Sequence, residues 1–86
     1  MGWCVYIVEC NDASLYTGIT TDLTSRLAKH NNGTGAKYTA ARRPVTLLYH
    51  EVATNRSDAS QREATIKKMT RAAKLALCQR QGQKHA

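Results

Sequence analysis

The sequence predicts an α/β (α+β) domain with a small three-stranded antiparallel-type sheet flanked by helices, in the order β-β-α-β-α-α. Three short runs rich in β-branched and aromatic residues predict the strands, and three stretches that follow capping residues predict the helices. A length of 86 residues suits one compact domain. We expect residues 1–81 to form this domain and residues 82–86 to be a frayed tail.

The first two strands form a predicted β-hairpin. Trp3 to Glu9 is a β-branched and aromatic run, which is typical of a mostly buried strand. Asn11 to Ser14 are turn-forming residue types, and Leu15 to Ile19 is the returning strand. Gly18 lies inside this second strand, where glycine often marks a bulge or a close approach to the backbone. A third strand is expected over residues 45–53, directly after the only proline.

A first helix is predicted between the hairpin and the third strand. Either Thr21 or Asp22 can cap it, and it ends near His30. Leu23 and Leu27 give it an apolar stripe. The Asn-Asn-Gly-Thr-Gly sequence that follows stops the helix, because glycine and asparagine tolerate the left-handed conformation. Residues 31–44 are therefore expected to be a loop or an irregular segment.

Two further helices are predicted after the third strand. Ser57 is the expected cap of the first, which ends near Met69. Thr70 can cap the last helix, from Arg71 to Gln81. We find no internal repeat, low-complexity block or linker in the sequence, and this again indicates one domain.

The chain is strongly basic. Its formal net charge is +7, from 13 Lys and Arg against 6 Asp and Glu, and its pI is about 9.7. Net charge informs about partners and not about fold. It favours contact with phosphate, in nucleic acid or at an anionic membrane, although a merely soluble basic protein has the same composition. No apolar run approaches the ~20 residues of a spanning helix, so no membrane partner is expected, and nothing indicates an obligate protein partner.

The cysteines and the N-terminus indicate a cytoplasmic location. Cys4, Cys10 and Cys78 include no Cys-x-x-Cys pair, which argues against a disulfide framework and a zinc site. The N-terminus has no basic region before its apolar stretch and no small-residue cleavage site after it, so a signal peptide is not expected. Reduced thiols in the cytoplasm are the simplest interpretation.

Three polar side chains stand at informative positions on the predicted helices. Arg26 and His30 are four residues apart and so share one helix face. Glu63 falls within a stripe that should pack inward, where a carboxylate is costly unless it has a partner or a metal. The alternatives are a solvated helix edge for Arg26 and His30, and a surface Glu63 paired with Lys67 at the favourable four-residue spacing.

Two strand tyrosines complete an ordered pattern, although a strand tyrosine alone indicates packing. Tyr16 follows Tyr6 by ten residues and precedes Gly18 by two. Arg26 comes ten residues later on the next helix, and Glu63 lies on the helix after the third strand. This pattern resembles the GIY-YIG nuclease superfamily.

The resemblance covers residues 3–75. Its half-motifs stand here as Cys4-Val5-Tyr6 and Tyr16-Thr17-Gly18. It is closest to the small, stand-alone single-domain bacterial branch, which has LYTGIT after the hairpin turn. Cys4 replaces the usual glycine of the family, and Thr17 replaces the usual isoleucine. Many members also carry a late asparagine, and no asparagine follows Asn55 here.

The resemblance implies a metal-dependent DNA endonuclease, with Arg26, His30 and Glu63 at the family's arginine, histidine and metal-binding glutamate. Glu63 would hold a divalent metal, Mg²⁺ first and Mn²⁺ as the alternative. Arg26 would complement charge growing on the phosphate. Tyr6 is the expected general base and Tyr16 the residue that orients water or phosphate. His30 would share the proton relay or contact phosphate.

Basic side chains supply the expected docking surface. The residues are Lys37, Tyr38, Arg42 and Arg43 in the loop, and Lys67, Lys68, Arg71 and Lys74 on the C-terminal helices. Such contacts give salt-dependent, sequence-independent affinity. Without a separate base-reading module, low sequence specificity is expected, on single-stranded or branched DNA. The alternatives are a non-catalytic module that binds DNA or RNA and keeps the nuclease fold, and a protein-interaction domain, which the charge disfavours.

A shared site requires both tyrosines on one face of the hairpin. Side chains alternate along strands and directly opposite residues share a face, so the loop length decides this. A four-residue loop, residues 11–14, would separate Tyr6 from Tyr16. A three- or five-residue loop, or a bulge near Gly18, would place them together. We predict one of these irregularities, with Arg26 and Glu63 converging on the same side around a concave, basic pocket.

Overall fold

A computed structural model describes residues 2–84 of the chain. Its elements are β1 (Trp3–Glu9), β2 (Leu15–Thr20), α1 (Leu23–Asn31), α2 (Lys37–Ala40), β3 (Thr46–Ala53), α3 (Arg56–Lys67) and α4 (Arg71–Lys84). The predicted fold class and the order β-β-α-β-α-α are confirmed. The one addition is the short helix α2, which lies within the segment predicted to be a loop or irregular.

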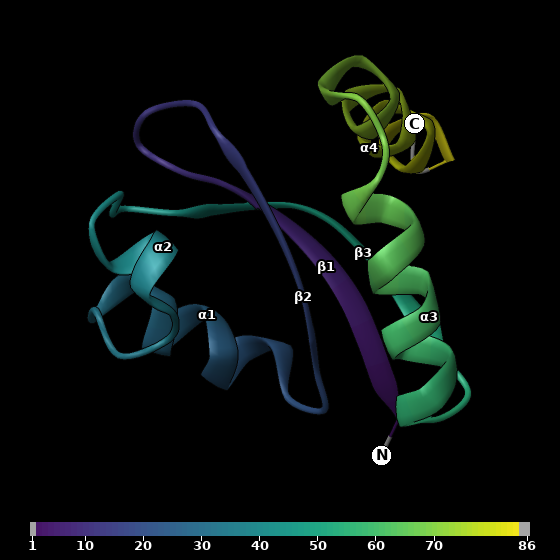
Figure 1. The fold of residues 1–86 in the computed structure, drawn as a ribbon, viewed down its shortest axis with the longest axis horizontal. Coiled ribbons are helices and arrows are strands. Elements are labelled where there is room, and N and C mark those ends of the chain that lie inside the picture. The colour runs from purple at the N-terminus through teal and green to yellow at the C-terminus, as the bar shows by residue number, and fades with distance from the viewer. Residues whose placement is uncertain (1, 85–86) are drawn as a thin grey trace.

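The three strands form one antiparallel sheet in the order β2-β1-β3, so that β1 is the central strand. Helices cover both faces of this sheet, with α1 and α2 on one side and α3 and α4 on the other (Figure 1). Among the described residues no helix is both long and apolar enough to span a membrane.

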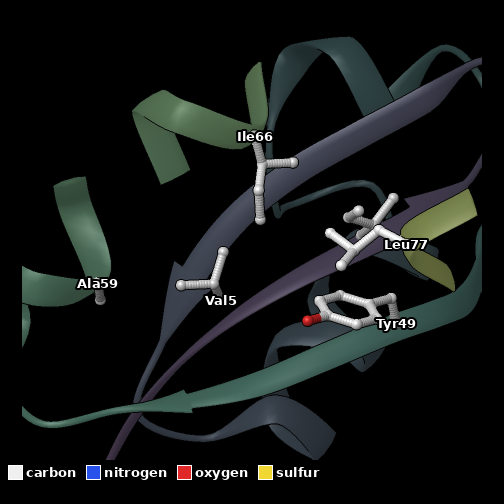
Figure 2. Close-up of a cluster of buried hydrophobic side chains, with 6 residues drawn as sticks. Val5, Tyr49, Ala59, Ile66 and Leu77 are labelled. Carbon is white, nitrogen blue, oxygen red and sulfur yellow. The ribbon is translucent and has the colours of Figure 1, made fainter. Parts of the chain in front are cut away.

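The side chains of β1 alternate between two separate cores. Val5 and Ile7 pack with Tyr49 and with residues of α3 and α4, and Figure 2 shows Val5 and Tyr49 facing Ala59, Ile66 and Leu77. A second cluster on the opposite face contains Tyr6, Val8, Cys10 and Val45, and the α1 leucines pack against it. Because β1 is buried on both faces, it carries an apolar residue at almost every position.

The hairpin loop has five residues, 10–14, because Glu9 and Leu15 form the last strand pair. Tyr16 therefore pairs with Val8, and Gly18 pairs with Tyr6. Tyr6 and Val8 lie on the same face of β1, and a directly opposite residue shares its partner's face. Both tyrosines consequently project toward α1, which confirms the predicted odd-numbered loop.

The helix boundaries correct two expectations from the sequence. Asp22, one of the two predicted caps, accepts a hydrogen bond from the Ser25 amide and begins α1. Helix α3 begins earlier than predicted, because Asn55 and not Ser57 is its cap and accepts from an amide one turn later. The last helix begins as predicted but continues past Gln81 to Lys84. It passes through a glycine, which costs a helix only about 1 kcal/mol. Positions 85–86 of the predicted tail lie outside the described residues.

Candidate active site

Tyr6 lies at the centre of the site and is fully buried. Its ring extends over the backbone of its strand partner, Gly18. A Cβ atom at Gly18 would lie 2.5 Å from the Tyr6 hydroxyl oxygen, closer than side chains can approach. Glycine is required here by a close approach to the backbone, which is one of the two roles predicted for it.

Helix α1 places two polar side chains against this phenol. The Tyr6 hydroxyl lies 2.8 Å from His30 Nε2, and Arg26 donates from Nε to the same hydroxyl oxygen at 3.4 Å. The four-residue spacing puts both residues on the face of α1 that meets the sheet. His30 is fully buried, so a solvated helix edge is excluded for it, as is direct contact with a phosphate in this conformation.

The segment after α1 encloses His30. A Cβ atom at Gly35 would lie 2.6 Å from His30 Nδ1, so only glycine leaves room for the ring. The hydroxyl of Thr39, on α2, lies 2.7 Å from His30 Nδ1 and is itself fully buried. Thr39 was not among the predicted site residues. It belongs to a four-residue helix, which is too short to give a periodic pattern in the sequence.

An aromatic stack leads from this buried network to the surface. The Tyr16 ring meets His30 edge-on, with 5.4 Å between ring centroids, and stacks on Tyr38 at 5.9 Å. The guanidinium carbon of Arg42 lies 3.9 Å from the centroid of the Tyr38 ring. The predicted residues Tyr38 and Arg42 therefore join the same arrangement as the two motif tyrosines.

Burial and charge set the protonation of the network. Burial raises the pKa of the Tyr6 hydroxyl, the hydrogen bond and charge of Arg26 oppose this, and the charges of Tyr16 and Glu63 add to it. Burial also lowers the pKa of His30, and the positive charge of Arg26 lowers it further. His30 is consequently a neutral imidazole at neutral pH, with one ring nitrogen free to accept a proton.

Glu63 lies on the helix after the third strand, as predicted. Its helix, α3, packs through Ala59 and Ile66 against the opposite face of the sheet from α1. The helices that carry Arg26 and Glu63 therefore cover opposite faces of the sheet, and the expected convergence of the two side chains stays a prediction. Glu63 and Tyr6 interact electrostatically, because the negative charge of Glu63 contributes to raising the pKa of Tyr6.

The carboxylate of Glu63 fits a metal held largely by water and substrate. Its side chain is 23% exposed and lies 3.3 Å from Lys67 Nζ, the ion pair proposed as the alternative. Within residues 2–84 no group of three or more His, Cys, Asp or Glu side chains could hold a metal ion. A single hard-oxygen ligand is compatible with Mg²⁺, which usually keeps several waters and is bound through one or two carboxylates and a substrate phosphate.

Three of the predicted docking cations are held by internal hydrogen bonds. Arg42 bonds Asp12 at 3.1 Å and the Tyr38 carbonyl at 2.9 Å. Arg43 donates to the Ala40 carbonyl at 2.9 Å, and Arg71 donates to the carbonyl of Ala13 in the hairpin loop at 2.6 Å. The side chains of Lys37 and Lys68 are exposed, and that of Lys74 is half-buried. The exposed lysines are thus the better candidates for phosphate contact.

The fold and the clustered tyrosines, arginine and histidine define a GIY-YIG domain. A family model described as the GIY-YIG catalytic domain matches residues 2–76, and the chain belongs to this family. Its relatives are UPF0213 proteins, a small single-domain group. One from Staphylococcus epidermidis is 57% identical over 75 residues, which is 87% of this chain and 92% of the relative. One from Streptococcus sanguinis is 58% identical over 72 residues, 84% of this chain and 83% of the relative.

Two solution NMR structures share the fold. The UPF0213 protein from Bacillus halodurans matches with a TM-score of 0.56 and 42% identity, over 90% of this chain and 82% of that one. A protein from E. faecalis matches with a TM-score of 0.61 and 42% identity, over 90% and 83% of the two chains. The family indicates a nuclease domain and a nucleic-acid substrate.

Proposed function

We propose that this protein is a cytoplasmic, metal-dependent endonuclease that hydrolyses phosphodiester bonds in DNA with low sequence specificity, on single-stranded or branched substrates. One observation carries the proposal: the Tyr6 hydroxyl lies between a neutral histidine at 2.8 Å and an arginine at 3.4 Å. A purely structural tyrosine needs one hydrogen-bond partner, whereas this phenol has both a proton acceptor and a cation.

The network supports Tyr6 as the general base. Burial raises the pKa of Tyr6, so a free tyrosinate is disfavoured at neutral pH. The phenol can act as a base if it passes its proton to His30 Nε2 as it takes a proton from the attacking water. The water oxygen then bonds to phosphorus, the ester bond to the leaving oxygen breaks, and the proton that left the phenol resides on His30.

Arg26 has two tasks in this proposal. At rest it caps the buried phenol, and its guanidinium is only partly exposed. When a phosphate enters, the guanidinium turns toward the phosphate oxygens and complements the charge that grows there. The same movement opens the Tyr6 oxygen to water. Tyr16, beside His30, would orient the water or the phosphate.

Glu63 would hold the divalent metal, Mg²⁺ or Mn²⁺. When bound, the metal would supply charge stabilisation at the phosphate and the leaving oxygen. Lys67 would have to release the carboxylate, and a partly exposed helical pair at this four-residue spacing is worth only about 0.3–0.5 kcal/mol. The ion pair is therefore no obstacle to metal binding.

The surface favours unpaired nucleic acid. Tyr38 is partly exposed, and its ring contacts both the Tyr16 ring and the Arg42 guanidinium. Stacked aromatic and guanidinium groups bind bases with little regard to sequence, at roughly 1–3 kcal/mol per stacked base. Exposed lysines add affinity for the backbone without reading bases. Both features support low specificity and substrates whose bases are accessible.

The assay for this proposal compares labelled single-stranded, duplex and branched DNA of the same length. Each is incubated with the protein in Mg²⁺, in Mn²⁺ and with a chelator. We expect cleavage with either metal, preference for the single-stranded or branched forms, and none with chelator. Cleavage that survives the chelator would contradict the metal dependence.

A non-catalytic DNA- or RNA-binding module is the second candidate. It is favoured by the complete burial of Tyr6, the proposed base, and by the pairing of Glu63, the proposed metal ligand, with Lys67. The same assay separates the two functions. Retarded migration of the labelled strands without cleavage in either metal would support the binding module.

A further inference from the structure

We propose that Thr39 is a positioning residue that fixes the tautomer of His30, so that the bare Nε2 atom always faces Tyr6. The catalytic consequence of this inference rests on the function proposed above. The position of the proton on His30 does not depend on that function, because the hydrogen bonds around the imidazole ring determine it.

The first step concerns the Thr39 hydroxyl. It donates to the Ala36 carbonyl oxygen at 3.1 Å, and a carbonyl oxygen can only accept. A hydroxyl has one proton, so Thr39 has none left for His30. It must therefore accept from His30 Nδ1, which lies 2.7 Å away. The Nδ1 atom consequently carries the proton of the neutral ring.

The second step follows from the neutral imidazole. With a proton on Nδ1, the Nε2 atom has only a lone pair, so at 2.8 Å it accepts from the Tyr6 hydroxyl. Arg26 Nε can only donate, and it donates to the Tyr6 oxygen. Every bond in the network then runs in one direction, from Arg26 through Tyr6 and His30 to Thr39 and the Ala36 carbonyl.

The opposite tautomer would leave groups unsatisfied. A proton on Nε2 would point at a phenol oxygen that already accepts from Arg26, and the proton of Tyr6 would lose its partner. Thr39 would then have to donate to Nδ1 and give up the Ala36 carbonyl. An unsatisfied buried polar group costs about 1–3 kcal/mol. The observed network therefore selects one tautomer strongly.

The backbone of this segment is suited to that role. Ala36 is the extended N-cap residue that precedes α2, and Thr39 follows it three positions later, the spacing at which a threonine hydroxyl can bond a preceding carbonyl. Gly35 leaves the space that the His30 ring occupies. The four-residue helix α2 thereby presents Thr39 to His30.

Thr39→Val is the decisive variant, because it keeps the shape of the side chain and removes the hydroxyl. Thr39→Ser restores the hydroxyl. Thr17→Val is the matched control, since Thr17 is also a buried threonine but its Oγ1 has no hydrogen-bond partner among the described residues. Should Thr39→Val fail to fold, Thr39→Cys replaces it, because a thiol is a similar size and a much weaker partner.

The readout is the tautomer of His30, measured above neutral pH by long-range ¹H–¹⁵N correlation spectra of ¹⁵N-labelled protein. We expect a proton on Nδ1 in the wild type, in Thr39→Ser and in Thr17→Val. Thr39→Val should show a substantial fraction of the other tautomer. In a cleavage assay kcat should fall about 10²-fold in Thr39→Val, with KM unchanged, and should recover in Thr39→Ser.

Two results would overturn the inference: a proton on Nε2 in the wild type, or an unchanged tautomer in folded Thr39→Val. Failure of the proposed function gives a different result. If the tautomer responds to Thr39 as expected while no form of the protein cleaves DNA, the role of Thr39 is supported and the endonuclease proposal is wrong.

Discussion

Gly18 leaves the space into which the Tyr6 hydroxyl extends, so a single methyl group there is sufficient to disturb the site. In Gly18→Ala the new Cβ would lie 2.5 Å from the hydroxyl oxygen, and the ring would have to move away from His30. We expect a loss of about 1–3 kcal/mol in the free energy of unfolding and loss of cleavage. Denaturant unfolding and the cleavage assay measure the two effects.

Gly2→Ala is the matched control for this variant. Its added Cβ would lie 3.7 Å from the nearest heavy atom, an ordinary contact with Val52. The control should keep wild-type stability and activity. A Gly18→Ala protein indistinguishable from Gly2→Ala would show that the phenol does not need this space.

His30 links stability to pH. Burial lowers its pKa, and the Arg26 charge adds to the effect, so the native state takes up the proton only below the ordinary value of 6.5. The unfolded chain takes it up near 6.5. Between the two pKa values the unfolded state holds more protons, so the free energy of unfolding must decrease as pH falls through this window.

We expect this decrease to begin near pH 6.5, with a slope of at most about 1.4 kcal/mol per pH unit for one proton. Urea unfolding at half-unit steps from pH 7.5 to 5.5 measures it. His50, which is exposed, provides the control, and His50→Gln should retain the decrease. A stability that stays constant over this range would show that the folded protein and the unfolded chain take up the His30 proton equally, so that burial does not lower its pKa.

Glu63 and Arg26 carry the charges that the proposed reaction needs. Neither side chain is fully buried, so Glu63→Ala and Arg26→Ala should each abolish cleavage and leave the fold intact. Lys67→Ala is the control, because it removes the other half of the ion pair and keeps the carboxylate. Circular dichroism checks the fold of each variant. A folded Glu63→Ala protein that cuts DNA at the wild-type rate would exclude Glu63 as the metal ligand.

At the scale of elements, the length of the hairpin loop decides which face Tyr16 occupies. With five residues between the strands, Tyr16 and Tyr6 share a face. One residue inserted into the loop turns every β2 side chain to the other face or shifts the strand pairing. We expect a one-glycine insertion after Asp12 to abolish cleavage and destabilise the protein. A two-glycine insertion, which preserves the alternation, should restore much of both.

Unfolding and cleavage measured on the two insertions test this expectation. The size of the loop should matter little in itself, because closing a slightly longer loop costs only a few tenths of a kcal/mol. Equal effects of the one- and two-residue insertions would mean that loop length, and not the alternation of faces, limits the hairpin.

The sequence predicted the elements well where a pattern runs over many residues. The β-branched run of β1 and the apolar stripe of α1 each predict an element that the structure contains. Short features were missed: α2 has four residues, and Thr39 contacts His30 across nine positions without any local signal. Serine is a good cap and the sequence therefore favours Ser57 for α3, but the nearby Asn55 is equally good and caps the helix in the structure.

The sequence indicates most of the side chains that meet around Tyr6, but not Thr39, and it indicates their geometry only in part. The spacing of Arg26 and His30 indicated a shared helix face, and the structure brings both to Tyr6. Sequence could not show which sheet face a helix covers, because that depends on how the chain crosses the sheet edge. The sequence alone therefore does not reveal that α3, which carries Glu63, packs on the face of the sheet opposite to α1, which carries Arg26.

At the scale of the whole molecule, the net charge of +7 should dominate nucleic-acid binding. Exposed Lys37 and Lys68 are better probes of it than Arg42, which also holds Asp12 and the Tyr38 carbonyl. Lys37→Ala and Lys68→Ala should each weaken DNA binding to a similar degree for all sequences. Each should also reduce the slope of log K against log salt by about 1.

Fluorescence anisotropy at several salt concentrations, with two unrelated oligonucleotides, provides the measurement. Arg42→Ala serves as the comparison, since it should lower thermal stability as well as affinity. If either lysine variant weakened binding to only one oligonucleotide, that lysine would be reading bases, and the proposed low specificity would fail.

The two-sided burial of β1 has a consequence for how the gene can vary. Positions 5 and 7 serve the core beneath α3 and α4, and positions 6 and 8 serve the face that carries the tyrosine network. Substitutions at positions 5 and 7 are limited only by the need to fold, so apolar residues of similar volume can replace one another there. Under the proposed function, Tyr6 is limited by chemistry as well. Neighbouring codons in one short strand would then be under different kinds of selection, and a lineage that lost the proposed cleavage activity would reveal the loss first at alternate positions of this strand.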